Sequence, residues 1–69
     1  MQEVVHNSVH DLRKEKQVTQ EDLARAVGVT RQTIIAVERG NYTPSVCLAL
    51  KIADYFNMHV EDIFYIETK

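Results

Sequence analysis

The sequence has few residues that cross-link a chain or break its secondary structure, with one cysteine, one proline and two glycines among its 69 residues. It also has no tryptophan. One cysteine excludes an internal disulfide, and 45% hydrophobic residues with so little glycine and proline argue against a disordered chain. No apolar run approaches the ~20 residues that span a bilayer, and the first residues do not resemble a secretory signal. We expect one packed domain over residues 1–69, with no membrane contact, in the reducing cytoplasm.

Positive charge is scarce as well, because ten acidic residues outnumber eight basic ones and the formal net charge is −2. This balance argues against a nucleic-acid partner, since proteins that bind nucleic acids neutralise phosphates with lysine and arginine. The charges are unevenly distributed, however. Residues 1–29 carry four basic and five acidic groups, residues 30–51 carry three and one, and residues 52–69 carry one and four. The middle segment is therefore the one with a net positive charge.

Helix boundaries are clearly marked along the chain. Four hydroxyl residues stand where a helix would begin, the first two with an aspartate three positions later as in a capping box: Ser8, Thr19, Thr30 and Ser45. Residues that tolerate a left-handed backbone follow three of the apolar-periodic runs: Gly28, Gly40 and Asn57. These marks predict helices over about 8–16, 20–27, 31–39, 46–56 and 60–64. The β-branched and aromatic residues at 3–5 and 64–67 predict short strands.

Apolar residues recur three or four positions apart within the predicted helices, so one side of each would face a shared core. These residues are Val9, Leu12, Leu23, Ala24, Val27, Ile34, Val37, Leu50, Ala53 and Phe56. The predicted fold class is all-α, with five helices and terminal strands able to form a small antiparallel sheet. The three histidines lack metal-ligand spacing, Cys47 is expected to be a partly buried small residue, and no catalytic constellation is evident. We therefore expect no enzyme, no metal, no cofactor and no small-molecule ligand.

The predicted second and third helices, joined by the short segment GVT, have the spacing of a helix-turn-helix over about residues 20–39. The segment TQEDLARAVGVTRQTIIAVERGNYTPSVCLALKIADYF resembles the five-helix repressors of the lambda and Cro (XRE-like) type. It is similar in particular to small bacterial regulators like the enterococcal cytolysin repressor. The resemblance extends from about residue 7 to residue 64. It implies a lambda-repressor-like fold and a transcription regulator that binds double-stranded DNA.

The third predicted helix would read the DNA. With Ile34 and Val37 turned inward, the residues left toward the major groove are Arg31, Gln32, Thr33, Ile35 and Ala36. Arginine can bond guanine and glutamine can bond adenine with two hydrogen bonds each, and an alanine methyl can pack on thymine. Gln20 and Thr30 lie at helix N-termini, where backbone N–H groups favour a phosphate, although Thr30 could serve as a cap alone.

The resemblance adds further roles. It implies that Gln20 binds a phosphate and that the loop after the third helix holds the DNA backbone, through Arg39, Asn41, Tyr42 and Thr43, although Tyr42 could instead pack on the protein surface. It also implies a buried or half-buried ion pair of Arg13 with Glu38, two charges on helix faces that otherwise point to the core.

One recognition helix and few cations would need a second copy to bind DNA specifically, so we expect a homodimer on a pseudo-palindromic operator. The residues left for the dimer interface are His59, Val60, Ile63, Phe64, Tyr65 and Ile66. In the cytolysin-repressor-like relatives the terminal strands form a sheet beside this interface, and Val4, Val5, Phe64 and Ile66 could supply it here. Three alternatives remain: an antitoxin, a restriction-system controller, and a helix-turn-helix fold used to bind another protein.

Overall fold

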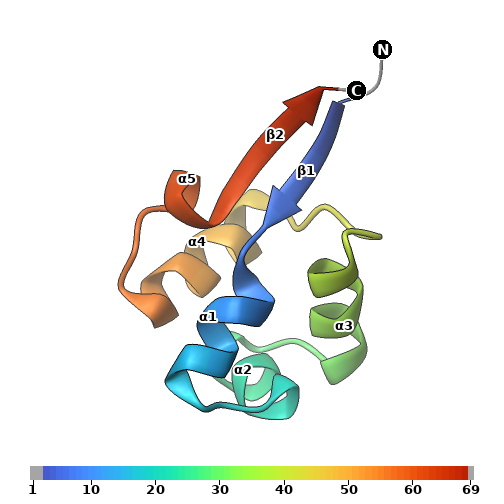
Figure 1. Cartoon of the computed structure of the whole chain (residues 1–69). Coiled ribbons are helices and arrows are strands. Elements are labelled where there is room, and N and C mark those ends of the chain that lie inside the picture. Colours follow the sequence, from blue (N-terminus) through green and yellow to red (C-terminus); the bar gives the residue numbers. More distant parts are fainter. Residues whose placement is uncertain (1–2, 69) are drawn as a thin grey trace.

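The computed structural model describes residues 3–68 and consists mostly of short helices (Figure 1). The elements follow in the order β1 (Glu3–Asn7), α1 (Val9–Lys16), α2 (Gln20–Val27), α3 (Arg31–Arg39), α4 (Val46–Phe56), α5 (Val60–Ile63) and β2 (Phe64–Thr68). The five helices and two terminal strands expected from the sequence are confirmed, with boundaries that differ by a few residues. No helix within residues 3–68 is both long and apolar enough to cross a membrane.

Side-chain caps begin three of the helices as the sequence indicated. At α2 the capping box is complete: Asp22 N donates to Thr19 Oγ1 at 2.9 Å, and Thr19 N donates to Asp22 Oδ2 at 3.1 Å. Thr30 and Ser45 each accept a hydrogen bond from the backbone N–H three residues later. The left-handed residues that end α2, α3 and α4 are those expected: Gly28, Gly40 and Asn57.

The start of α1 differs from the expectation. The Ser8 side chain makes no capping hydrogen bond. Instead Asn7 Oδ1 accepts a hydrogen bond from Val9 N at 3.1 Å, because Asn7 is turned toward the helix at the end of its strand. At its other end α1 terminates at Gln17, which is left-handed with φ 59° and which the sequence did not mark.

The core lies where the helices converge and is fully closed around six side chains: Leu23, Ile34, Ile52, Ile63, Val9 and Val37. The prediction for Leu50 was wrong, because this side chain is 55% exposed and Leu48 and Ile52 face inward instead. Cys47, expected to be partly buried, is exposed. Most residues of α4 are apolar, so spacing alone does not select its buried face. The packing of α4 against α2 and α5 selects it.

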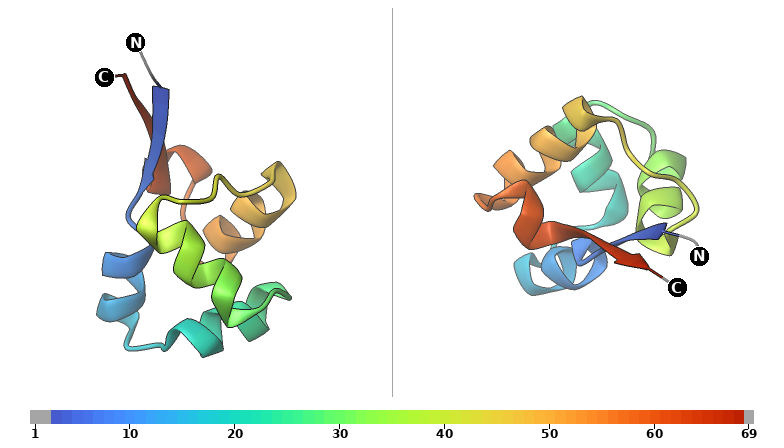
Figure 2. Two further views of the ribbon diagram at one scale, coloured as in Figure 1. Left: turned by 90° about the vertical axis from the view of Figure 1, so that its right-hand side faces the viewer. Right: turned by 90° about the horizontal axis from the view of Figure 1, so that it is seen from above.

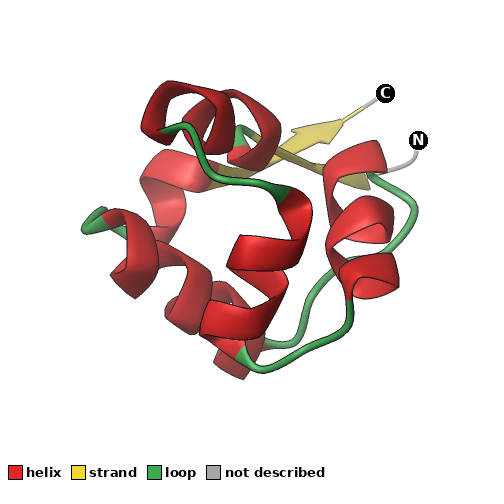
Figure 3. Cartoon of the chain, turned by 90° about the horizontal axis from the view of Figure 1, so that it is seen from below, coloured by secondary structure: helices red, strands yellow, loops and turns green. Residues whose placement is uncertain are grey.

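The two strands form an antiparallel ribbon that projects from the helical body (Figures 1 and 2). Val5 pairs with Ile66 and Asn7 pairs with Phe64, so residues expected to build the sheet do so. The described ends of the chain lie together at the tip of the ribbon (Figure 1). The helices gather at its other end, which Figure 3 shows from below, with α5 beside the start of β2. The terminal sheet and the helical body therefore meet at the Asn7–Phe64 end of the ribbon.

Candidate nucleic-acid interface

The helices α2 and α3 are joined by a three-residue turn and are packed through their apolar sides. The turn closes with a hydrogen bond from Val29 N to Ala24 O at 2.9 Å. Ile34 and Val37 of α3 and Leu23 of α2 are each 0% exposed. Burial of these three side chains fixes the rotation of α3 about its axis and determines which residues of α3 face outward.

The outward face of α3 carries free hydrogen-bonding groups. Arg31, Gln32 and Arg39 are exposed, and Ile35 and Ala36 between them are half-buried. Within residues 3–68, no ion pair involves either of these two arginines. Their guanidinium groups are therefore available to an external acceptor.

Thr30 and Thr33 are engaged with each other at the start of α3. Thr33 N donates to Thr30 Oγ1 at 3.3 Å, and the two hydroxyl oxygens lie 3.1 Å apart. Thr30 is therefore a helix cap, and Thr33 is half-buried rather than fully presented to solvent.

Arg13 of α1 and Glu38 of α3 form the ion pair that the resemblance implied. Arg13 Nε donates to Glu38 Oε2 at 2.8 Å and Arg13 Nη2 donates to Glu38 Oε1 at 3.3 Å. The side chains are 11% and 6% exposed, so the pair is almost removed from water. Arg13 also donates to Val18 O at 3.1 Å and to His10 Nδ1 at 3.2 Å. The pair ties α1 to α3.

Burial alone would raise the pKa of the Glu38 carboxyl. The hydrogen bonds from Arg13 and Gln20 and the charge of Arg13 outweigh burial, so this pKa lies below its ordinary value. Glu38 is therefore ionised at neutral pH, and it is a hydrogen-bond acceptor for both partners.

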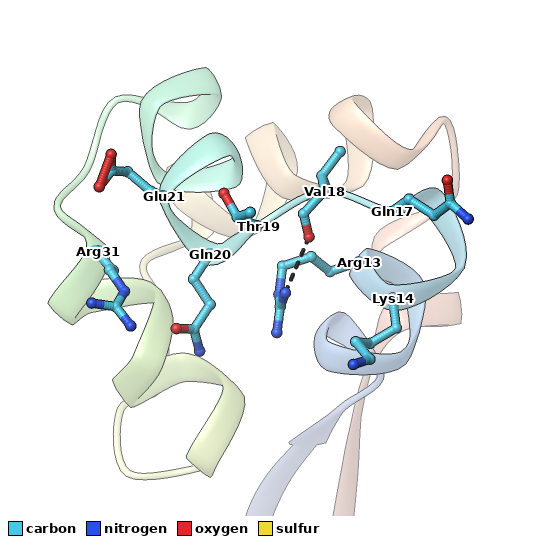
Figure 4. A pocket seen from close by; sticks show the side chains of 8 residues that line it. All are labelled: Arg13, Lys14, Gln17, Val18, Thr19, Gln20, Glu21 and Arg31. Atoms are coloured by element: carbon cyan, nitrogen blue, oxygen red, sulfur yellow. Dashed lines mark hydrogen bonds between the residues drawn. The ribbon is translucent and has the colours of Figure 1, made fainter.

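Gln20, at the first turn of α2, is held by the same carboxylate. Its Nε2 donates to Glu38 Oε1 at 3.1 Å, which turns the nitrogen end of the amide toward α3 and leaves one N–H free. Gln20 and Arg31 line two adjoining clefts, one with Lys14 of α1 and the other with Arg39. In Figure 4 the side chains of Lys14, Gln20 and Arg31 extend toward the same open side of the first cleft. Cationic and amide donors from α1, α2 and α3 therefore converge there.

The loop after α3 begins at Gly40 and continues through three exposed residues, Asn41, Tyr42 and Thr43. Tyr42 is 45% exposed, so a large part of its ring is open to solvent. Asn41 N donates to Ala36 O at 3.0 Å, which fixes the exit of the loop from the helix.

Comparison with known proteins identifies the fold and the class of protein. The family model described as helix-turn-helix (HTH_3) matches residues 9–63, which is most of the chain. The chain belongs to the helix-turn-helix family.

This helix-turn-helix protein is similar to two transcriptional regulators in sequence and to a controller protein in structure. An uncharacterized HTH-type transcriptional regulator of Bacillus subtilis, YgzD, is 51% identical over 88% of this chain and 92% of its own length. The cryptic phage CTXphi transcriptional repressor RstR from Vibrio cholerae is 28% identical over 83% of this chain and 51% of its own length. The crystal structure of the restriction-modification controller protein C.AhdI from Aeromonas hydrophila superposes with a TM-score of 0.73 at 31% identity, covering 78% and 82% of the two chains. The protein is a transcriptional regulator with an XRE-like helix-turn-helix DNA-binding fold.

The residues expected at a dimer interface fall into two groups in this helix-turn-helix protein, one with exposed surface and one buried. His59 is exposed, Val60 is half-buried, and Tyr65 and Ile66 are 53% and 65% exposed. Ile63 and Phe64 are 0% and 9% exposed and belong to the core of the chain itself. The expectation for these two residues is therefore corrected, because they have almost no surface to offer to a second copy.

Sequence reasoning missed three residues around the site. Lys14, near the end of α1, lines the first cleft. His10, at the start of α1, lines the second cleft because α1 packs against α3 there, beside Glu38. Asn7 contacts α3 from the end of β1. No local sequence pattern marks any of the three, because the contacts that bring them to the site are with residues of other elements.

Proposed function

We propose that the protein is a cytoplasmic, single-domain, sequence-specific repressor that binds a two-fold symmetric DNA operator as a homodimer. The observation that carries the proposal is the outward face of α3. Arg31, Gln32 and Arg39 are exposed there, and among residues 3–68 neither arginine has a carboxylate partner; the second N–H of the Gln20 amide lies beside them.

The chemistry of α3 suits the major groove. Arg31 can donate two hydrogen bonds to guanine O6 and N7, and Gln32 can pair with adenine N6 and N7. Ile35 and Ala36 add apolar surface for a thymine methyl, and Thr33 lies at the edge of this face. Such contacts distinguish one base pair from another, whereas contacts to phosphates do not.

The surrounding residues suit the DNA backbone. Gln20 retains one amide N–H, Thr30 caps a helix whose N-terminus favours an anion, and Arg39 is exposed at the other end of α3. The exposed loop residues Asn41, Tyr42 and Thr43 would hold the adjacent phosphates. With the charge of Arg31, these contacts offset the net charge of −2.

A second copy is expected to supply the second half-site. The ribbon and α5 present His59, Val60, Tyr65 and Ile66, and the acidic residues near them would be repelled by phosphates. A two-fold pairing on this surface would direct two recognition helices to grooves ~34 Å apart. The likeness to the repressor RstR supports repression as the outcome of binding.

The likeness to C.AhdI favours one alternative role, the control of a restriction system. Such a controller would use the same DNA-binding face. A protein-interaction module, favoured by the net charge, would not need that face.

Selection of duplexes from a random pool by the purified protein tests the proposal. We expect recovered sites with an inverted repeat and an affinity that falls steeply as salt rises, because phosphate contacts release counterions. Recovery of no preferred sequence, or binding to a protein partner that is insensitive to salt, would contradict it.

A further inference from the structure

Asn7 makes two hydrogen bonds that require opposite ends of its side-chain amide. Its Nδ2 donates to Val37 O at 2.9 Å, and its Oδ1 accepts from Val9 N at 3.1 Å. A flipped amide would lose both bonds, since a carbonyl accepts and a backbone N–H donates. The side chain is therefore locked between α1 and α3.

The acceptor for Asn7 lies at the end of the groove-facing helix. Val37 is in the last turn of α3, and its carbonyl also accepts from Gly40 N at 3.0 Å. Gly40 has φ +78°, a left-handed conformation with which the loop after α3 begins. The Asn7 amide thus binds the carbonyl at which α3 stops and this loop begins.

Asn7 also belongs to the base of the ribbon. It pairs with Phe64 as the last residue of β1, and the next residue, Ser8, donates its N–H to Ile63 O at 3.0 Å. Phe64 and Ile63 are core residues, so this base cannot move freely against the helices. One side chain therefore joins the ribbon to the helix that faces the DNA.

We propose that Asn7 is a positioning residue that sets the angle between the ribbon and α3. Two recognition helices meet successive grooves only when each is held at a defined orientation to the two-fold axis. If two copies pair through the ribbon, the two-fold axis passes beside it. The Asn7–Val37 hydrogen bond then fixes the orientation of α3, and of the loop that would contact phosphates, relative to that axis. The effect on DNA binding rests on the proposed function. The effect of Asn7 on the end of α3 can be tested in the protein without DNA.

Two variants remove the bond to α3 while keeping an acceptor for Val9 N. Asn7→Ser leaves a hydroxyl and Asn7→Asp leaves a carboxylate, and both side chains can accept from a backbone N–H two residues later. Neither can donate to Val37 O in the way the amide does. Asn57→Asp is the matched control, because it adds the same charge at an exposed left-handed position that aspartate tolerates. Within the described part of the chain, the Asn57 side chain forms no hydrogen bond to another helix.

Affinity is measured on a duplex selected by the parent protein, at a temperature where circular dichroism shows every variant folded. Both Asn7 variants are expected to bind about three- to tenfold more weakly, the loss of one partly buried hydrogen bond. Asn57→Asp is expected to stay within about twofold. In the free proteins, amide hydrogen exchange at Gly40 and Asn41 is expected to be faster in the Asn7 variants.

The exchange measurement separates this inference from the proposed function. Unchanged exchange at Gly40 and Asn41 in Asn7→Ser would overturn the positioning role whether or not DNA is bound. Faster exchange with unchanged affinity of the folded variant would overturn transmission to the DNA face and leave a purely structural bond. A parent protein that selects no duplex would refute the proposed function, and the exchange data would still decide whether Asn7 holds the end of α3.

Discussion

Replacing Glu38 with alanine is expected to destabilise the protein more than any ordinary surface change. The substitution removes both hydrogen bonds of the ion pair from Arg13 and the acceptor of Gln20. Breaking a buried pair costs about 3–5 kcal/mol because the remaining charge is stranded. Arg13 keeps its bonds to Val18 O and His10, so we expect a loss of about 3 kcal/mol, the lower end of that range.

That loss is large for a chain of this size. Native domains have about 0.05–0.15 kcal/mol of stability per residue, so 69 residues correspond to about 3–10 kcal/mol. A shift of about 4–8 °C per kcal/mol in a small domain gives a melting temperature lower by at least about 12 °C. The double variant Arg13→Leu with Glu38→Leu should recover much of the loss, because it leaves no buried charge.

Thermal and urea denaturation followed by circular dichroism measures these effects, and Glu21→Ala is the matched control. Glu21 pairs with Arg25 at 3.3 Å, but the two side chains are 65% and 73% exposed. An exposed pair of this kind contributes about 0.2–1 kcal/mol or less. The reasoning is refuted if Glu38→Ala is no more destabilising than Glu21→Ala, or if the double variant is no more stable than the single one.

Three further predictions concern DNA reading, assembly and pH. In duplex selection, Arg31→Ala and Gln32→Ala should each relax the preference at individual base pairs, because one two-bond contact discriminates between bases by about 1–3 kcal/mol. Gln20→Ala should lower the affinity for all sequences alike. An unchanged base preference in both recognition-helix variants would show that α3 does not read the sequence. In sedimentation at micromolar concentration, the parent should be a dimer and Ile66→Glu a monomer that loses cooperative operator binding, so a monomeric parent or a dimeric variant would contradict the ribbon interface. Because the pKa of Glu38 is lowered by folding, its contribution to stability is complete at neutral pH and is lost as acid protonates it below its ordinary range. The thermal denaturation midpoint should therefore decrease as the pH is lowered from 5 to 3, and it should decrease more in the parent than in the Arg13→Leu, Glu38→Leu variant. Equal pH dependence in the two proteins would contradict this prediction.

The elements whose signals are local were predictable from the sequence. The capping box of Thr19 and Asp22 and the left-handed Gly28 and Gly40 act within three or four residues, so their spacing in the chain is also their spacing in space. The apolar spacing of α3 likewise predicts Arg31 and Gln32 on its solvent-exposed face, opposite Ile34 and Val37. This is why the helix-turn-helix and its outward face could be predicted.

Tertiary packing decided the rest. In α4 the apolar residues lie on most sides, so only contact with α2 and α5 could bury Ile52 and expose Leu50. Thirty residues separate Asn7 from Val37, and eighteen separate Gln20 from Glu38, so no sequence pattern marks either hydrogen bond. Periodicity follows from the geometry of one helix, whereas these pairings depend on how separate elements are placed against one another, and that placement is set by the shared core.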